Sequence, residues 1–321
     1  MASRRALSLL GAIALATTAC GATPATKLHP EALTDVPAAA DGDVAAQRLA
    51  TTPARYRTAI FPSATSSEHI YATKPDLMSG QPITLRLDVY QPTGDANTAR
   101  PLLVWIHGGG FAFGNRGSMA WMSRDYARLG YVTATISYRL DPGNKCLQVQ
   151  AGQYTGAQLI AERARCERAV LGARDDAASA IAWLRANAAT FGIDTTRVAV
   201  GGSSAGAITA LHVGQTLNTP GNPPPADVRV GAVLAMSGCN YVEGSIDAFD
   251  TPVAVLASGG DALVPFTCSV ATVDQAIAVG TPVMRHYFEL ESGHAQGLYS
   301  AHQGEVDRAW RQFLVDHLEL T

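Results

Sequence analysis

Short apolar runs alternate with longer amphipathic stretches along most of the chain. Residues 102–106, 131–138 and 198–200 are compact apolar runs, which predict buried strands. Residues 119–129 fit a helix, and residues 175–191 repeat apolar side chains on one helical face. Strands that alternate with helices in this way predict an α/β fold, in which a mainly parallel central sheet has helices on both faces.

The pattern continues on both sides of this region. Residues 84–90 alternate polar and apolar side chains as a half-exposed strand does, and we expect the leading strands to be antiparallel. Further short apolar strands are predicted at 230–236, 253–257 and 283–290. A closing helix is predicted at 301–318.

One segment does not fit the alternation. Residues 141–172 are polar and longer than an ordinary connection between a strand and a helix. We therefore expect a small cap insertion there, lying over the active site. Residues 237–250, which follow a predicted strand, are a second candidate for the rim of that site.

The first twenty residues are typical of an export signal. Arg4 and Arg5 precede an apolar stretch at 6–16, and small residues follow before Cys20. The stretch is too short to span a bilayer permanently. Residues 18–21 resemble the cleavage box of bacterial lipoproteins, so that Cys20 is a candidate for lipidation and membrane attachment. Export without lipidation, as a secreted or periplasmic protein, is the alternative.

The composition predicts one folded domain behind this signal. Residues 21–52 are rich in alanine, threonine and proline without sustained periodicity, which indicates a flexible tether. Residues 53–321 then form the folded domain, and a hydrophobic content of 47% is enough to fill one large core.

Charge and motif content exclude several classes of function. The net charge is −3, and no basic cluster occurs beyond the first five residues, which argues against a nucleic-acid partner. The sequence has no glycine-rich phosphate loop with a following lysine, and no CxxC or HExxH spacing. We therefore expect chemistry without a cofactor or a metal.

Export to an oxidising compartment would allow the cysteines to form disulfides. Without Cys20 four remain, and in an oxidising compartment an even number indicates two disulfides. We favour Cys146 with Cys166 and Cys239 with Cys268, because the first pair closes a local insertion and the second joins loops after neighbouring strands. Four buried free thiols are the alternative.

The most informative motif is Gly-Ser-Ser-Ala-Gly at 202–206. It follows the apolar run 198–200 and precedes a helix-favouring run, so Ser204 lies on a turn from a strand into a helix. This is the arrangement of a nucleophile elbow, where the flanking glycines avoid collisions and the serine hydroxyl is exposed.

The motif His-Gly-Gly-Gly-Phe at 107–111 supplies the second half of this chemistry. It ends the strand at 102–106, and consecutive glycines there leave backbone N–H groups free to point into a pocket. Such donors would stabilise the oxyanion that develops during acyl transfer, and each is worth about 3–4 kcal/mol of barrier.

With these motifs the chain resembles the alpha/beta-hydrolase esterases that have an HGGG loop, including hormone-sensitive-lipase-like and bacterial feruloyl-esterase-like enzymes. The resemblance runs from about residue 83 to the C-terminus. Besides the two motifs it rests on residues 137–140, 175–176, 260–265 and 293–294.

The resemblance implies that the backbone N–H groups of Gly109 and Gly110 belong to the oxyanion hole. Ala205 joins them by its place directly after the nucleophile. The chain departs from the lipase-like branch at Ser203 and Ala207, where that branch has an acidic residue and a glycine.

A serine nucleophile needs a base and a carboxylate, which this fold supplies in the order serine, acid, histidine. His294 directly follows the last predicted strand, where a loop can reach the elbow. Asp261 follows the strand at 253–257, just beyond the edge of the sheet where such sites are built. We therefore predict the triad Ser204, His294 and Asp261.

Other histidines and acids of the chain are less well placed for the roles of base and acid. His302 ranks second as base, whereas His286 and His317 lie within a strand and a helix. The rival acids are Asp247, Asp250 and Glu291. We expect His107 to shape the glycine loop, and Asp175 and Asp176 to cap or charge the start of a helix.

These features predict an exported carboxylic ester hydrolase that works through an acyl-enzyme on a small-molecule or polymeric ester. A peptidase or acyltransferase of the same fold is one alternative. A non-catalytic binding lipoprotein on a hydrolase scaffold is another.

Overall fold

The computed structural model describes residues 55–217, 222–241 and 246–321. The predicted export signal at 1–20, the lipidation of Cys20 and the tether at 21–52 lie outside the described residues. Within the described part the strands form one eight-stranded sheet, in the order β1-β2-β4-β3-β5-β6-β7-β8. Its strands are β1 (Ala64–Pro75), β2 (Pro82–Pro92), β3 (Arg100–Ile106), β4 (Val132–Ile136), β5 (Ile193–Ser203), β6 (Ala232–Met236), β7 (Val253–Ser258) and β8 (Val283–Phe288).

The sheet is antiparallel at one edge and parallel elsewhere. β1 pairs with β2 and β2 with β4 in antiparallel register, while all pairs from β4 to β8 are parallel. The carboxyl ends of these six parallel strands therefore meet at one edge, which is where loops can build a site.

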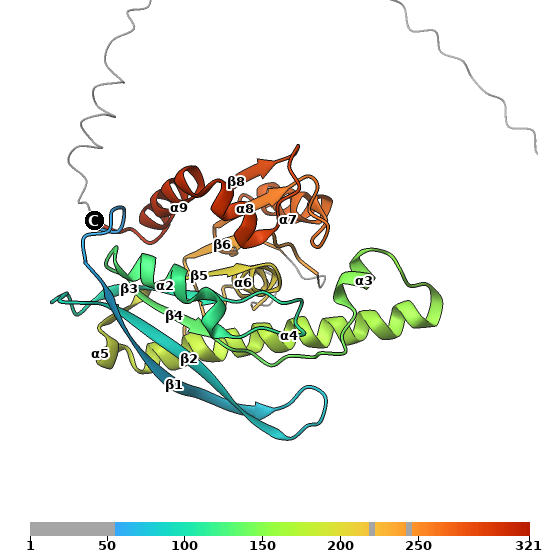
Figure 1. Ribbon diagram of the computed structural model, residues 1–321, viewed down its shortest axis with the longest axis horizontal. Helices are drawn as coiled ribbons and strands as arrows, with labels where there is room; N and C mark the ends of the chain where they lie inside the picture. Colours follow the sequence, from blue (N-terminus) through green and yellow to red (C-terminus); the bar gives the residue numbers. More distant parts are fainter. Residues whose placement is uncertain (1–54, 218–221, 242–245) are drawn as a thin grey trace, which may run out of the picture. The chain divides into compact units, whose positions relative to one another are not determined.

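Helices cover both faces of this sheet, as Figure 1 shows. The helical segments are η1 (Arg116–Met119), α2 (Ala120–Ala127), α3 (Cys146–Gln150), α4 (Gly156–Ala186), α5 (Ala188–Phe191), α6 (Ala205–Gln215), α7 (Phe266–Ala278), α8 (Ala295–Ala301) and α9 (Gln303–His317). One apolar core lies under α4, α6 and α7, and the other lies under α2, α8 and α9.

The central strands are apolar throughout because both of their faces are covered. Every residue of β3 is buried, and its side chains alternate between the two cores. Leu102, Val104 and Ile106 pack beneath α4 and α6, whereas Leu103 and Trp105 pack beneath α2 and α9. This two-sided burial explains why such strands appear in the sequence as continuous apolar runs.

The predicted boundary between a cap at 141–172 and a helix starting at Asp175 is wrong. α4 is one helix of 31 residues that contains most of the predicted cap and most of the predicted helix. The predicted cap ends at Gly172. In the structure this glycine lies within α4, where a Cβ would be 3.1 Å from the Leu77 side chain, so it makes room for the β1–β2 hairpin. Only residues 141–155, with α3, stand apart from α4 as loop and short helix.

Asp175 and Asp176 consequently lie within α4 and do not cap its start. The Asp176 carboxylate is fully buried, accepts hydrogen bonds from the backbone N–H and guanidinium of Arg139, and lies 2.9 Å from Lys74 Nζ. It thereby ties α4 to β1 and to the loop after β4. The expectation of a helix-capping role for Asp176 was wrong.

Two disulfides join helices to the site end of the sheet. Cys146 on α3 pairs with Cys166 on α4, and Cys239, after β6, pairs with Cys268 on α7. These are the pairings that the sequence favoured. Among the described residues no helix has both the length and the apolar composition needed to cross a membrane.

Candidate active site

Ser204 occupies a strained turn between β5 and α6. Its backbone has φ 56° and ψ −120°, which is unusual for a residue with a side chain and costs about 1–3 kcal/mol. The Ser204 N–H donates to the carbonyl oxygen of Met236 at 2.8 Å, which holds the turn against the end of β6. The strain orients a nucleophile in the way the elbow motif predicts.

The elbow packs directly against the end of β3. A Cβ on Gly206 would lie 2.1 Å from the carbonyl oxygen of Ile106, so only glycine allows this approach. A Cβ on Gly108 would lie 3.2 Å from the Ser204 Cβ, which shows how closely the glycine loop approaches the nucleophile. The two motifs, about a hundred residues apart in the sequence, therefore form one site.

Two of the three predicted oxyanion donors line the cleft of Ser204, and the third directly follows it in the chain. Gly109 and Gly110 line the same cleft as Ser204. Ala205 is the first residue of α6, so its N–H is one of the helix N-terminal groups that lack a partner within the helix. The arrangement suits an anion beside Ser204, and the assignment of these N–H groups to an oxyanion remains a prediction.

His107 has the shaping role that we expected. It is fully buried, stacks on Tyr138 at 4.4 Å between ring centroids, and contacts the carbonyl oxygen of Gly108 through Nδ1 at 2.6 Å. Burial lowers the pKa of His107 to about 4, only partly opposed by the hydrogen bond to Gly108. The imidazole is therefore neutral near pH 7 and supports the glycine loop.

The predicted base and acid are in contact. His294 Nδ1 lies 2.7 Å from one carboxylate oxygen of Asp261 and 2.9 Å from the other. The Asp261 side chain is 2% exposed and that of His294 is 24% exposed, so the acid is covered while the imidazole reaches the cleft. With Nδ1 engaged by Asp261, Nε2 is the ring nitrogen left to exchange a proton.

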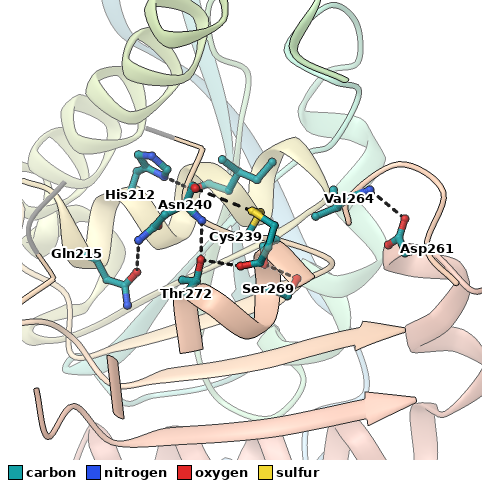
Figure 2. Close-up of a disulfide and its surroundings, with 11 residues drawn as sticks. His212, Gln215, Cys239, Asn240, Asp261, Val264, Ser269 and Thr272 are labelled. Atoms are coloured by element: carbon teal, nitrogen blue, oxygen red, sulfur yellow. Dashed lines mark hydrogen bonds between the residues drawn. A yellow bond between two sulfur atoms is a disulfide. The ribbon is translucent and has the colours of Figure 1, made fainter. Parts of the chain in front are cut away.

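Asp261 is held as a carboxylate. Burial alone would raise its pKa, but hydrogen bonds from His294 and from the backbone N–H groups of Val264 and Leu263 outweigh burial and lower it. Figure 2 shows the Val264 N–H directed at the Asp261 carboxylate, close to the Cys239–Cys268 bridge. An ionised acid is what a histidine base needs behind it.

The rival residues lie in other contacts. His302 Nε2 and a Glu291 carboxylate oxygen are 2.8 Å apart, and the His302 ring stacks on Phe288. Asp250 accepts a hydrogen bond from the backbone N–H of Asp247. None of these four titratable side chains lines the cleft that contains Ser204.

Ser204 and His294 line one cleft of about 410 Å³. Its walls come from the glycine loop, from the elbow, from α3 and from the loops after β7 and β8. The lining residues are Gly108, Gly109, Gly110, Phe113, Gly114, Ser118, Leu147, Ser203, Ser204, Leu263, His294, Ala295, Gln296 and Gly297. Within the described residues no group of three or more His, Cys, Asp or Glu side chains could hold a metal ion.

Sequence reasoning missed several residues of this site. Leu147 was hidden in the polar cap segment, although it forms a wall of the cleft. Ser237 and Ser258 contact the backbone on either side of His294 through their hydroxyls. Single serines that end apolar strands give no signal in one sequence, because serine is common at such positions for many reasons.

Comparison with known proteins agrees with this geometry. Residues 163–251 match a family model described as alpha/beta hydrolase fold, and residues 87–149 match a model named BD-FAE. The chain is 29% identical over 174 residues to esterase LipC of Mycobacterium tuberculosis, covering 52% of this chain and 37% of LipC. It is 30% identical over 131 residues to Lipase 1 of Geotrichum candidum, covering 40% of this chain and 21% of the lipase. The matched segment thus spans well under two thirds of either relative.

Solved structures share the whole fold. The propionate-bound esterase 2 of Thermogutta terrifontis superposes with a TM-score of 0.59 at 19% identity, covering 78% of this chain and 94% of that one. The same esterase phosphorylated by paraoxon gives a TM-score of 0.57 with the same coverage. With its eight-stranded, mostly parallel sheet and its serine elbow, the chain has the alpha/beta-hydrolase fold. Its matched segments are similar to those of esterases and lipases.

Proposed function

We propose that this protein is a carboxylic ester hydrolase that acts through an acyl-enzyme on Ser204. The observation that supports this most directly is the contact of His294 Nδ1 with Asp261, beside a strained Ser204 in the same cleft. Serine esterases need this combination of nucleophile, base and orienting acid.

The geometry suggests how each residue takes part. Ser204 Oγ attacks the ester carbonyl carbon while His294 Nε2 accepts the hydroxyl proton, and Asp261 stabilises the resulting imidazolium. The backbone N–H groups of Gly109, Gly110 and Ala205 stabilise the oxyanion. His294 returns the proton to the departing alcohol. A water molecule then attacks the acyl-enzyme while His294 accepts its proton, and His294 returns a proton to Ser204 Oγ as the acid leaves.

The dimensions of the cleft favour small esters. About 410 Å³ is near the lower end of the range of about 300–1,000 Å³ that is typical of small-molecule sites. Phe113, Leu147 and Leu263 provide apolar walls for an acyl or alcohol group. The Thermogutta esterase 2 was solved with propionate and with butyrate bound, and as part of the proposal we expect this chain to act on esters of similarly short acids.

We also propose that the protein is exported. The two disulfides support this, because such bonds form and persist in oxidising compartments. Free-thiol titration of protein recovered from the cell envelope or medium, compared with protein trapped in the cytoplasm, tests it. Recovery of the protein only from the cytoplasm, with its four thiols reactive, would contradict export.

The proposed activity is tested by two neighbouring serines. Ser204→Ala removes hydrolysis of p-nitrophenyl esters and labelling by a serine-directed phosphonate, because the motif and the strained turn both centre on Ser204. Ser203→Ala is the matched control and retains both. The same esters, from acetate to palmitate, give the chain-length preference. Labelling that persists in Ser204→Ala would place the nucleophile elsewhere.

A further inference from the structure

Ser237 lies between the nucleophile and the base. It directly follows β6, is almost completely buried, and has a positive φ of 52°. Its hydroxyl accepts a hydrogen bond of 2.9 Å from the backbone N–H of Ala295, which belongs to the peptide group that follows His294. One side chain is thus bonded directly to the backbone of the base.

The peptide group that precedes Ser237 contacts the nucleophile. Its carbonyl, that of Met236, accepts the N–H of Ser204 at 2.8 Å. The Ser237 N–H, in the same peptide group, donates to the carbonyl oxygen of Leu256 in β7 at 2.8 Å. Ser237 and this peptide group together connect the elbow of Ser204, the loop of His294 and the neighbouring strand.

A second buried serine holds the other side of His294. The hydroxyl of Ser258, the last residue of β7, donates to the Gly293 carbonyl in the peptide group that precedes His294. Both peptide groups of His294 are consequently fixed by hydroxyls at the ends of two adjacent strands. Such fixing is needed because Ala295, the next residue, has a positive φ of 46° and so a strained backbone.

We propose that Ser237 is a positioning residue that sets the placement of His294 relative to Ser204, and that Ser258 assists it. The inference rests on the proposed function and identifies what keeps the nucleophile and base in register. A displacement of about 1 Å between reacting groups can reduce a rate by about 10²-fold, so two hydroxyls that fix the base are sufficient to affect catalysis.

The proposal predicts the kinetics of Ser237→Ala. Loss of the hydroxyl frees the Ala295 N–H and lets the His294 loop shift, so kcat falls by about 10²-fold while KM changes little. Ser258→Ala lowers kcat in the same direction. The proton in the hydrogen bond between His294 Nδ1 and Asp261 gives a low-field resonance in proton NMR. This resonance shifts or broadens in Ser237→Ala and in Ser258→Ala, whereas a variant that is only less stable would keep it unchanged.

A matched control separates positioning from general packing. Ser269 on α7, labelled in Figure 2, is equally buried, and its hydroxyl donates to the carbonyl oxygen of Gly238 and has no hydrogen bond to His294 or Ser204. Ser269→Ala therefore leaves kcat and the low-field resonance unchanged. Ser237→Gly also lacks the hydroxyl, but glycine adopts the positive φ without strain. It therefore replaces Ser237→Ala if that variant does not fold, and its kcat should fall by the same factor.

The outcomes are distinguishable from failure of the proposed function. The proposal is overturned if folded Ser237→Ala or Ser237→Gly matches Ser269→Ala in kcat and keeps the wild-type resonance. Failure of the wild-type protein to hydrolyse esters would contradict the proposed function, yet the resonance would still report whether Ser237 and Ser258 fix His294.

Discussion

At the scale of single residues, burial decides what each histidine can do. His107 precedes the glycine loop and is enclosed and neutral, whereas His294 lines the cleft with a carboxylate behind it. Only His294 has the placement that the proposed base requires. The two imidazoles therefore differ in role because of their surroundings rather than their chemistry.

The stability of the protein should depend on pH through His107. In the unfolded chain His107 binds a proton below its ordinary pKa of about 6.5, but in the folded protein only below about 4. The free energy of unfolding is therefore unaffected by His107 above pH 6.5 and decreases as the pH falls towards 4. The total decrease due to His107 is about 3 kcal/mol. Urea unfolding of the wild type and of His107→Gln between pH 7 and pH 4.5 checks this, with a shallower pH dependence expected for the variant.

The comparison of the two proteins isolates this contribution. His286 and His317 also have pKa values lowered by burial, but both remain in the variant, so their contributions cancel. Equal pH dependence in the two proteins would show that His107 does not titrate between the folded and unfolded states as expected.

Replacing Asp261 by asparagine should remove most activity while preserving the fold. An amide at this position can donate to His294 Nδ1, which places the ring proton on Nε2 and stops it from accepting the Ser204 proton. We expect a decrease in kcat of about 10⁴-fold for Asp261→Asn. Initial rates on p-nitrophenyl acetate measure it. Glu291→Gln, which changes the acid paired with His302, is the control that should retain activity.

The grouping of the three proposed triad residues at one edge of the sheet could be predicted from sequence because each follows a recognisable strand. Ser204, Asp261 and His294 come after β5, β7 and β8, and parallel strands bring their carboxyl ends together. Ser237 also follows a strand, yet it lies within no motif. Its importance arises from its hydrogen bond with Ala295 and from the contact of the preceding Met236 carbonyl with Ser204, both of which depend on how the loops close in three dimensions.

At the scale of elements, α3 and α4 shape one side of the cleft. Leu147 on α3 lines the cleft, and the adjacent Cys146 is bonded to Cys166 on α4. In Figure 1, α3 and the amino-terminal part of α4 project together beyond the sheet. A short helix of five residues has little stability of its own, so the disulfide is what keeps Leu147 in place.

Removing this disulfide should change substrate selectivity. In Cys146→Ser/Cys166→Ser, α3 is no longer tied to α4, so the wall formed by Leu147 loosens and longer esters gain relative to acetate in kcat/KM. The stability loss should be about 3 kcal/mol for a bridge that spans 20 residues. Rates across p-nitrophenyl esters, with thermal unfolding to confirm folding, measure both effects.

The outcome of that experiment is interpretable against a second variant. Leu147→Ala removes the wall residue while the bridge stays intact, and it should shift the length profile in the same direction. An unchanged profile in both variants would mean that α3 does not limit the size of the substrate.

The extent of α4 could not be deduced from the sequence. Asp175, Asp176 and the preceding Gly172 resemble a helix start, because glycine and aspartate are common at such boundaries. In the structure Gly172 accommodates Leu77, and Asp176 is buried against Arg139 and Lys74. Both features depend on the β1–β2 hairpin, which lies about a hundred residues earlier, so local patterning could not reveal them.

At the scale of the whole molecule, the sheet order explains why the fold was predictable. Strands buried on both faces give continuous apolar runs, and these marked β3 to β7 in the sequence. β1 was not identified, because most of its residues are exposed or only partly buried at the sheet edge and their pattern is weak. Edge strands depend more on their partner than on their own composition.

The attachment of that edge to the rest of the domain should depend on Asp176. Asp176→Ala leaves Lys74 and Arg139 without their shared carboxylate, and breaking a buried pair in this way costs about 3–5 kcal/mol. Chemical unfolding gives the loss, and kcat on p-nitrophenyl acetate at low temperature should remain near the wild-type value. Asp175→Ala, which removes an exposed carboxylate one residue away, is the control.

The wall that α3 forms beside Ser204 is bonded to a continuous helix. Because α4 runs unbroken from its Cys166 bridge into the core, we expect α3 not to swing aside as a separate lid. Lipases with movable lids become faster when an oil–water interface forms, because the interface stabilises the open state. For this protein the rate should instead rise smoothly with ester concentration through the solubility limit, as expected for an enzyme that meets its substrates one molecule at a time in solution.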